Sequence, residues 1–183
     1  MSLGLESKTV RVVPYDSEWA AMYQAEAARL RTFLDAARVD IALEHTGSTA
    51  VEGLAAKPII DILGGLHSGE ARASVIDALM SAGYVHRGEQ GIPGREFFRR
   101  GEPRQYHLHL VLIGSDFWRD HRDFRDYLRI HRDERDAYAA LKAELAQRYP
   151  KDREAYTDGK AEFVQRVIAL ARASQRRQGL FTV

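Results

Sequence analysis

The sequence predicts an α+β fold, in which helices cover a small mixed β-sheet and the C-terminal part is helical. Three observations support this prediction: short apolar runs alternate with helical periodicity, a hairpin pattern follows, and only helical periodicity remains after about residue 113. A length of 183 residues suits one domain. We therefore expect a single domain over 1–183, with an α/β core at 10–113 and a helical part at 114–173.

The first third of the chain is expected to contain two strands and a long helix. The β-branched run at 10–13 predicts an edge strand that ends at Pro14. Ser17 is expected to cap a helix of about 20 residues, because apolar side chains recur at helical spacing from Trp19 to Leu34. The run at 40–45 predicts a second strand, which leads into a tight turn.

The middle of the chain alternates strand and helix patterns. A strand is expected at 59–63, ended by the glycines at 64–65, and a helix at 70–82. A short strand is expected at 84–86, a loop at 88–94, and a hairpin formed by 95–100 and 106–112. Three apolar stripes at helical spacing then predict that the remaining chain is helical.

Composition and charge exclude several functions. Lys and Arg number 27 against 26 Asp and Glu, and this balance argues against nucleic acid as the main partner. The chain has no cysteine, which excludes disulfides, thiolate metal sites and cysteine nucleophiles. No run approaches the ~18 apolar residues that span a bilayer. We expect a cytoplasmic protein that has no membrane partner.

Asp61 is the most informative polar residue, because it interrupts an otherwise apolar strand. An ionised carboxylate in such a place costs several kcal/mol unless it is paired or binds a metal. This cost favours a functional role. The alternative is an aspartate at the strand end that reaches solvent or caps a neighbouring loop.

Gly47, Ser48 and Thr49 follow the strand at 40–45 and form a second candidate site. A Gly-Ser turn that leads into a helix offers backbone N–H groups and a hydroxyl to a phosphate. The alternative is an ordinary turn with a helix cap.

His107 and His109 alternate in a strand pattern, so both imidazoles are expected on one face, roughly 7 Å apart at Cα. They can bind one metal ion or one phosphate, or can be polar residues on a solvated face. Lys57 lies between the Gly-Ser turn and Asp61, and Lys160 lies between two aromatic residues of one helix face. Both lysines are candidates to neutralise a bound anion.

Taken together, several segments closely resemble the GrpB family, also called UPF0157. The matching segments are Val13-Pro14-Tyr15-Asp16 with Trp19, Glu44 to Ile62, His107-Leu108-His109, Arg125 to Arg129, Tyr138 with Leu141-Lys142, and Tyr156 with Lys160 and Phe163. The segment from Glu44 to Asp61 is the most specific. The resemblance covers nearly the whole chain, from about Val10 to Ala171.

This resemblance implies the fold of the nucleotidyltransferase superfamily. It places Gly47 and Ser48 at the phosphate-holding turn and Asp61 at the first metal carboxylate. Leu63 stands where the second carboxylate is expected, and His109 falls near the position of a later-strand carboxylate. The carboxylate set is therefore incomplete, and the ordinary two-metal site cannot assemble.

Two metal sites remain open at this point. Asp61, His107 and His109 can hold one softer ion such as Mn²⁺ or Zn²⁺, whereas Mg²⁺ prefers oxygen ligands. Alternatively, Glu44 contributes a second carboxylate from the neighbouring strand.

Three functions follow as hypotheses. The first is a nucleotidyltransferase that binds a nucleoside triphosphate with a divalent cation and uses Asp61, His107 and His109 in catalysis. The second is a non-catalytic nucleotide-binding module, and the third is a metal-assisted phosphate hydrolase. In each case the partner is a small phosphorylated ligand, held by Gly47, Ser48, Thr49, Lys57 and Lys160. Because family members also occur fused to dephospho-CoA kinase, the resemblance further implies an association with that kinase.

Overall fold

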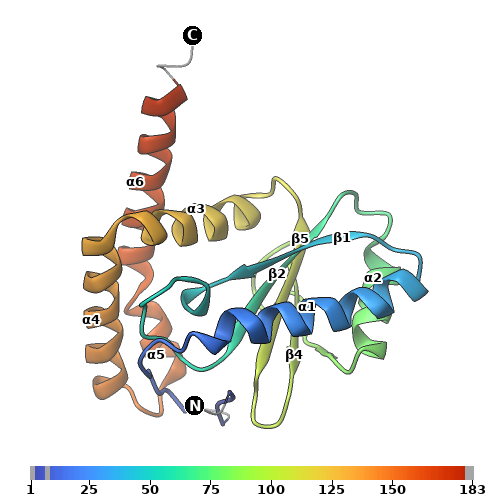
Figure 1. The fold of residues 1–183 in the computed structure, drawn as a ribbon, viewed down its shortest axis with the longest axis horizontal. Helices are drawn as coiled ribbons and strands as arrows, with labels where there is room; N and C mark the ends of the chain where they lie inside the picture. The colour runs from blue at the N-terminus through green and yellow to red at the C-terminus, as the bar shows by residue number, and fades with distance from the viewer. Residues whose placement is uncertain (1–2, 7–8, 180–183) are drawn as a thin grey trace.

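The computed structural model describes residues 3–6 and 9–179, which form a mixed β-sheet with helices (Figure 1). The strands are β1 (Ile41–Thr46), β2 (Ile60–Leu66), β3 (Val85–His86), β4 (Glu96–Arg100) and β5 (Tyr106–Leu112). The helices are α1 (Glu18–Ala36), the short 3₁₀ helix η1 (Ser48–Ala50), α2 (Arg72–Ser81), α3 (Asp116–Ile130), α4 (Arg132–Arg148), α5 (Arg153–Asp158) and α6 (Ala161–Gly179). The predicted α+β class is confirmed.

The five strands form one sheet in the order β1-β2-β5-β4-β3. β2 and β5 run parallel, and the other neighbouring pairs run antiparallel, so the sheet is mixed as expected. The parallel pair puts Asp61 beside His107 and Leu63 beside His109. Because paired residues point to the same face of a sheet, these four side chains share one face.

The other face of the sheet carries the larger apolar core. There α1 and α2 pack on Ile60, Ile62, Phe98, Leu108 and Leu110, all of which are buried. Apolar residues of α1 recur every three or four positions, so one side of the helix is buried, with Trp19, Tyr23, Leu30 and Leu34 on it. This core leaves the face that carries Asp61 free for polar side chains.

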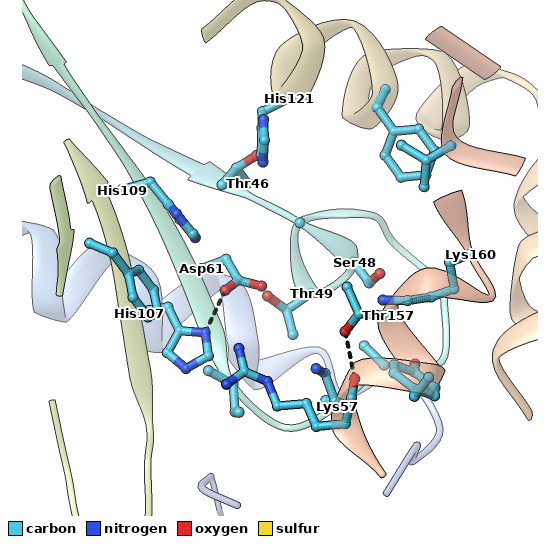
Figure 2. Close-up of a pocket in the computed structure, with 18 of the residues that line it drawn as sticks. Thr46, Ser48, Thr49, Lys57, Asp61, His107, His109, His121, Thr157 and Lys160 are labelled. Carbon is cyan, nitrogen blue, oxygen red and sulfur yellow. Dashed lines mark hydrogen bonds and ion pairs between the residues drawn. The ribbon is translucent and has the colours of Figure 1, made fainter. Parts of the chain in front are cut away.

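The helical part lies beside the sheet (Figure 1). α3 leaves the end of β5 and packs against α6, and its Trp118 contacts Leu63 and Val111 on the polar face of the sheet. α4 to α6 follow, so that α5 and the start of α6 lie across from the turn after β1 (Figures 1 and 2). Among the described residues, none of the helices has both the length and the apolar character needed to cross a membrane.

Three local predictions are wrong. Residues 10–13 form no strand, and only Val13 makes an isolated bridge, to Ala56. Ser17 makes no side-chain cap, because Asp16 accepts from the Glu18 N–H at 3.0 Å instead. Gly64 and Gly65 do not end β2, which continues to Leu66; glycine at position 65 leaves room for Trp118, because a Cβ there would lie 2.6 Å from the Trp118 ring.

Candidate functional site

The candidate site is a cavity of about 490 Å³ on the polar face of the sheet, where β1 and β2 meet α5 and α6. Its lining includes every residue that the sequence singled out for phosphate or metal binding except Glu44: Gly47, Ser48, Thr49, Lys57, Asp61, His107, His109 and Lys160. Figure 2 shows Asp61 near the middle, with His107 and His109 on one side and Ser48 and Lys160 on the other.

Gly47 makes the close approach between the turn and Asp61 possible. Its φ of 69° and ψ of −169° lie in a region that is essentially restricted to glycine. A Cβ at this position would lie 2.6 Å from Asp61 Oδ2. The turn therefore needs glycine for two reasons, and it brings Ser48 and Thr49 next to the carboxylate.

Asp61 is held by His107 on the neighbouring strand. His107 Nδ1 donates to Asp61 Oδ1 at 3.1 Å, and the carboxylate is 31% exposed to the cavity. Burial raises the pKa of Asp61, but the hydrogen bond from His107 and the positive potential of neighbouring basic groups, Lys57 among them, outweigh burial and lower the pKa to about 2. Asp61 is thus ionised at neutral pH and available to a cation.

The histidines of the cavity are neutral bases rather than cations. Burial lowers the pKa of His107, of His121 and, most strongly, of His109. His107 Nε2 and His109 Nδ1 are buried without a hydrogen-bond partner among the described residues. These imidazoles shape the wall beside Asp61 but add no positive charge to it at pH 7.

Three lysines form the opposite wall. The Tyr156 ring contacts both Lys57 and Lys160, whose Nζ atoms are 5.2 and 4.5 Å from its centroid. Lys142 is 2% exposed, lies 4.5 Å from the Tyr138 ring centroid, and donates to the Ala55 carbonyl. Within the described chain, none of the three lysines forms an ion pair with a carboxylate.

Burial and neighbouring positive charges lower the pKa of two of these lysines, and the charge of Asp61 only partly offsets this. Burial lowers the pKa of Lys57 to about 8, and burial together with repulsion from Lys57 lowers the pKa of Lys160 to about 7. Arg153, at the start of α5, adds to this positive potential. Of the described lining residues, six are Lys or Arg and one, Asp61, is a carboxylate.

Glu44 does not line this cavity, so the structure does not bring it together with Asp61 as a second carboxylate. Its carboxylate forms ion pairs with Arg125, at 2.8 Å, and Arg122, at 3.2 Å, and lines a separate cavity of about 1000 Å³. His45 also lines that second cavity, where it stacks on Tyr23 and is hydrogen-bonded to Thr49 at 2.9 Å.

The predicted metal set of Asp61, His107, His109 and Glu44 is therefore not assembled. Across residues 3–6 and 9–179, no three His, Asp or Glu side chains come together in an arrangement that could hold a metal ion. Leu63, at the expected second carboxylate position, is fully buried against Val111 and Trp118. The carboxylate that the cavity itself offers to a cation is Asp61.

Several residues of the cavity were not identified from the sequence as site residues. Arg95 and Arg99 lie in the cavity lining but belong to the predicted hairpin, and Lys142 belongs to a segment that carries the family resemblance, so neither assignment marked these three as site residues. A lysine within an apolar helix stripe, the signal that identified Lys160, also marks Lys142. Arg153 has no comparable local signal, because its place depends on how α5 packs.

Comparison with known proteins identifies the family. The sequence profile of the GrpB protein family matches residues 9–170. A UPF0157 protein of Pseudomonas aeruginosa is 42% identical over 173 residues, which cover 91% of this chain and 69% of that protein. A dephospho-CoA kinase of Mycolicibacterium paratuberculosis is 31% identical over 175 residues, which cover 80% of this chain and 42% of the kinase.

Two solved structures support the same fold. The crystal structure of GrpB from Enterococcus faecalis has a TM-score of 0.81 and 31% identity, and the match covers 90% of this chain and 99% of that one. The Cid1 poly(U) polymerase bound to MgATP has a TM-score of 0.54 at 12% identity, over 75% of this chain and 45% of that one. At this identity the second match shows a shared nucleotidyltransferase-like fold alone.

Proposed function

The chain belongs to the GrpB protein family, and we propose that it binds a nucleoside triphosphate, together with a divalent cation, in the cavity around Asp61. The observation that carries this proposal is the charge on the Ser48–Lys160 side of the cavity, where the lining includes the basic side chains Lys57, Lys142, Arg153 and Lys160 and the single carboxylate Asp61. Buried charges without partners are costly, and a polyanion that enters the cavity removes this cost.

The arrangement of the polar groups suits a polyphosphate chain. The hydroxyl of Ser48 and the turn that carries it lie on one side of the cavity, and Lys57, Lys142 and Lys160 lie on the adjoining wall. Lysine is a common phosphate ligand, and turns of this kind present backbone N–H groups to anions. A triphosphate fits this combination better than an uncharged ligand does.

A divalent cation fits the site in one limited form. Mg²⁺ in nucleotide sites is usually held by one or two carboxylates, by the phosphates and by water. Asp61 supplies one hard oxygen ligand beside the phosphate-binding turn, and the second oxygen of its carboxylate lies against Gly47. A bound divalent cation would neutralise charge on the phosphates, and Asp61 is the residue of this chain that would hold the cation.

Nucleotidyl transfer, in which an acceptor oxygen displaces pyrophosphate from the α-phosphorus, is the reaction that the fold suggests. A non-catalytic binding module is the second candidate, and the specific observation that favours it is the buried Leu63 at the second carboxylate position. The phosphate hydrolase is not proposed, because it depends on a metal set that the described residues do not assemble.

Thermal unfolding with nucleotides tests the proposal. A nucleoside triphosphate at 100 times its dissociation constant stabilises the folded state by about 2.7 kcal/mol, which raises Tm by about 5–10 °C for a chain of this size. We expect this shift with Mg²⁺ present, and we expect Asp61→Asn to remove its metal dependence. Asp77→Asn, an exposed carboxylate on α2, serves as the matched control.

Two outcomes separate the candidates. Release of pyrophosphate that requires Asp61 supports transfer, whereas tight binding without turnover supports the binding module. If no nucleoside triphosphate shifts Tm with or without Mg²⁺, the proposed function is wrong.

A further inference from the structure

A row of paired residues crosses the polar face of the sheet and extends beyond Asp61. Asp61 on β2 pairs with His107 on β5, and His107 pairs with Arg99 on β4. Because paired residues point to the same face, the Arg99 and Asp61 side chains share that face. Arg99 lies two strands from Asp61, which is about 10 Å across the sheet. It lies on the His107 side, whereas Ser48 and Lys160 lie on the other side of Asp61 (Figure 2).

Arg99 and Arg95 form a second basic surface in the cavity. The Phe97 ring between them in sequence supports both guanidinium groups, which lie 5.3 and 5.2 Å from its centroid. His109 stacks on the same ring with a centroid distance of 5.0 Å. These contacts fix the direction of both arginine side chains before any ligand binds.

Neither arginine has a carboxylate partner in the described parts of the chain. Arg95 is 8% exposed and donates only to backbone carbonyls, those of Glu89 at 2.8 Å and Gln90 at 3.3 Å. The Nε of Arg99 is buried and makes no hydrogen bond. In contrast, the next residue on β4, Arg100, forms an ion pair with Glu26 at 2.9 Å.

This lack of a partner has a cost that a ligand can relieve. Burial lowers the pKa of Arg99 to about 10 and also lowers that of Arg95, and the charge of Arg153 contributes to both shifts. Both side chains remain cationic at neutral pH, so two positive charges lie against the Phe97 ring, and no carboxylate of the described residues neutralises either of them.

We propose that Arg95 and Arg99 form a second anion subsite, which binds the phosphate group of a second ligand while the nucleoside triphosphate occupies the Ser48–Lys160 side. This inference rests on the proposed function, because it assigns a second occupant to the same cavity. In a nucleotidyl transfer this second ligand is the acceptor, which is therefore a phosphorylated molecule.

Charge favours phosphate over a carboxylate as the recognised group. Two guanidinium groups carry two positive charges, and a phosphate monoester carries about −1.5 to −2 at neutral pH. Guanidinium groups also present paired N–H donors that match phosphate oxygens. A monocarboxylate such as acetate neutralises only one of the two charges and is expected to bind more weakly.

Calorimetric titration of inorganic phosphate into protein that is saturated with a non-hydrolysable nucleoside triphosphate and Mg²⁺ tests the inference. We expect one further equivalent of phosphate to bind, and acetate to bind more weakly. Arg99→Gln is expected to weaken phosphate at least about tenfold, the loss of one charge-assisted contact, with nucleotide affinity unchanged. Arg87→Gln is the matched control, because Arg87 is exposed, lies close enough to Arg99 to affect its pKa, and does not line the cavity.

The outcomes distinguish this inference from the proposed function. If the nucleotide binds but phosphate does not, or if Arg87→Gln weakens phosphate as much as Arg99→Gln does, the second subsite is wrong. If Arg99→Gln weakens the nucleotide itself, the two arginines belong to the nucleotide site and the inference is again wrong. If the nucleotide does not bind at all, the proposed function fails; phosphate titrated into the free protein then decides whether Arg99 binds an anion.

Discussion

Replacement of Gly47 by alanine tests how the phosphate-binding turn and Asp61 depend on each other. A non-glycine residue at φ 69° and ψ −169° costs about 1–3 kcal/mol. The new Cβ would also lie 2.6 Å from Asp61 Oδ2, so the carboxylate must move and lose its bond from His107, which costs about 1.5–3 kcal/mol more. We expect Gly47→Ala to lower the free energy of unfolding by about 2.5–6 kcal/mol in urea denaturation at pH 7.

Two comparisons isolate the part of this loss that comes from Asp61. Gly88 also has a positive φ, of 67°, but a Cβ there meets nothing within 4 Å, so Gly88→Ala carries only the backbone cost. In an Asp61→Ala background, Gly47→Ala is expected to cost less than in the wild type, and the difference measures the coupling. Equal losses for Gly47→Ala in both backgrounds, matching the loss for Gly88→Ala, would refute the reasoning.

Three further predictions concern single residues. Burial lowers the pKa of Lys160 to about 7, and a bound anion raises this pKa again, so ligand binding at pH 7.5 takes up protons. Calorimetry in buffers of different ionisation enthalpy measures this uptake, which Lys160→Gln should reduce. Zero proton uptake in the wild type would contradict the charge argument. Burial lowers the pKa of His45 from 6.5 to about 4, so the unfolded state takes up the proton first as the pH falls. The contribution of neutral His45 to the free energy of unfolding is fully present above about pH 6.5 and is lost as the pH falls toward 4, by at most about 3 kcal/mol. The free energy of unfolding of His45→Gln should therefore fall less steeply with pH than that of the wild type, and equal slopes would contradict this cause. Glu26 is 4% exposed and accepts hydrogen bonds from Arg29, Arg100 and Tyr84. Glu26→Ala should therefore lower the free energy of unfolding, measured by urea denaturation, by about 3 kcal/mol or more. A decrease below about 1 kcal/mol would show that this cluster is dispensable.

Most of the fold follows from local patterns in the sequence. α1 and β1 were predictable because their apolar residues recur at the period of the element and face one core. The end of β2 was not, because Gly64 and Gly65 suggest a stop from the sequence alone. In the structure Gly65 leaves space for Trp118, which approaches from α3 more than fifty residues later.

The candidate site divides in the same way. Asp61, Ser48 and Lys57 lie within one continuous segment, so their residue types were informative before the fold was known. The partner of Glu44 is Arg125, which lies 81 residues away, and no local pattern predicts that Arg125 pairs with it. Arg99 joins the site only because β4 pairs with β5 in a register that places it beside His107. Tertiary contacts, rather than propensity, decide these two positions.

Direct titration of a nucleoside triphosphate with Mg²⁺ into this protein tests the central claim, that the excess of basic side chains around Asp61 is a polyphosphate site. We predict saturable binding of one equivalent, weakened at least about tenfold by Lys160→Gln, because that variant removes an amine that becomes a cation when the anion binds and that no carboxylate in the described chain neutralises. Absence of saturable binding, or an affinity that Lys160→Gln leaves unchanged, would contradict it.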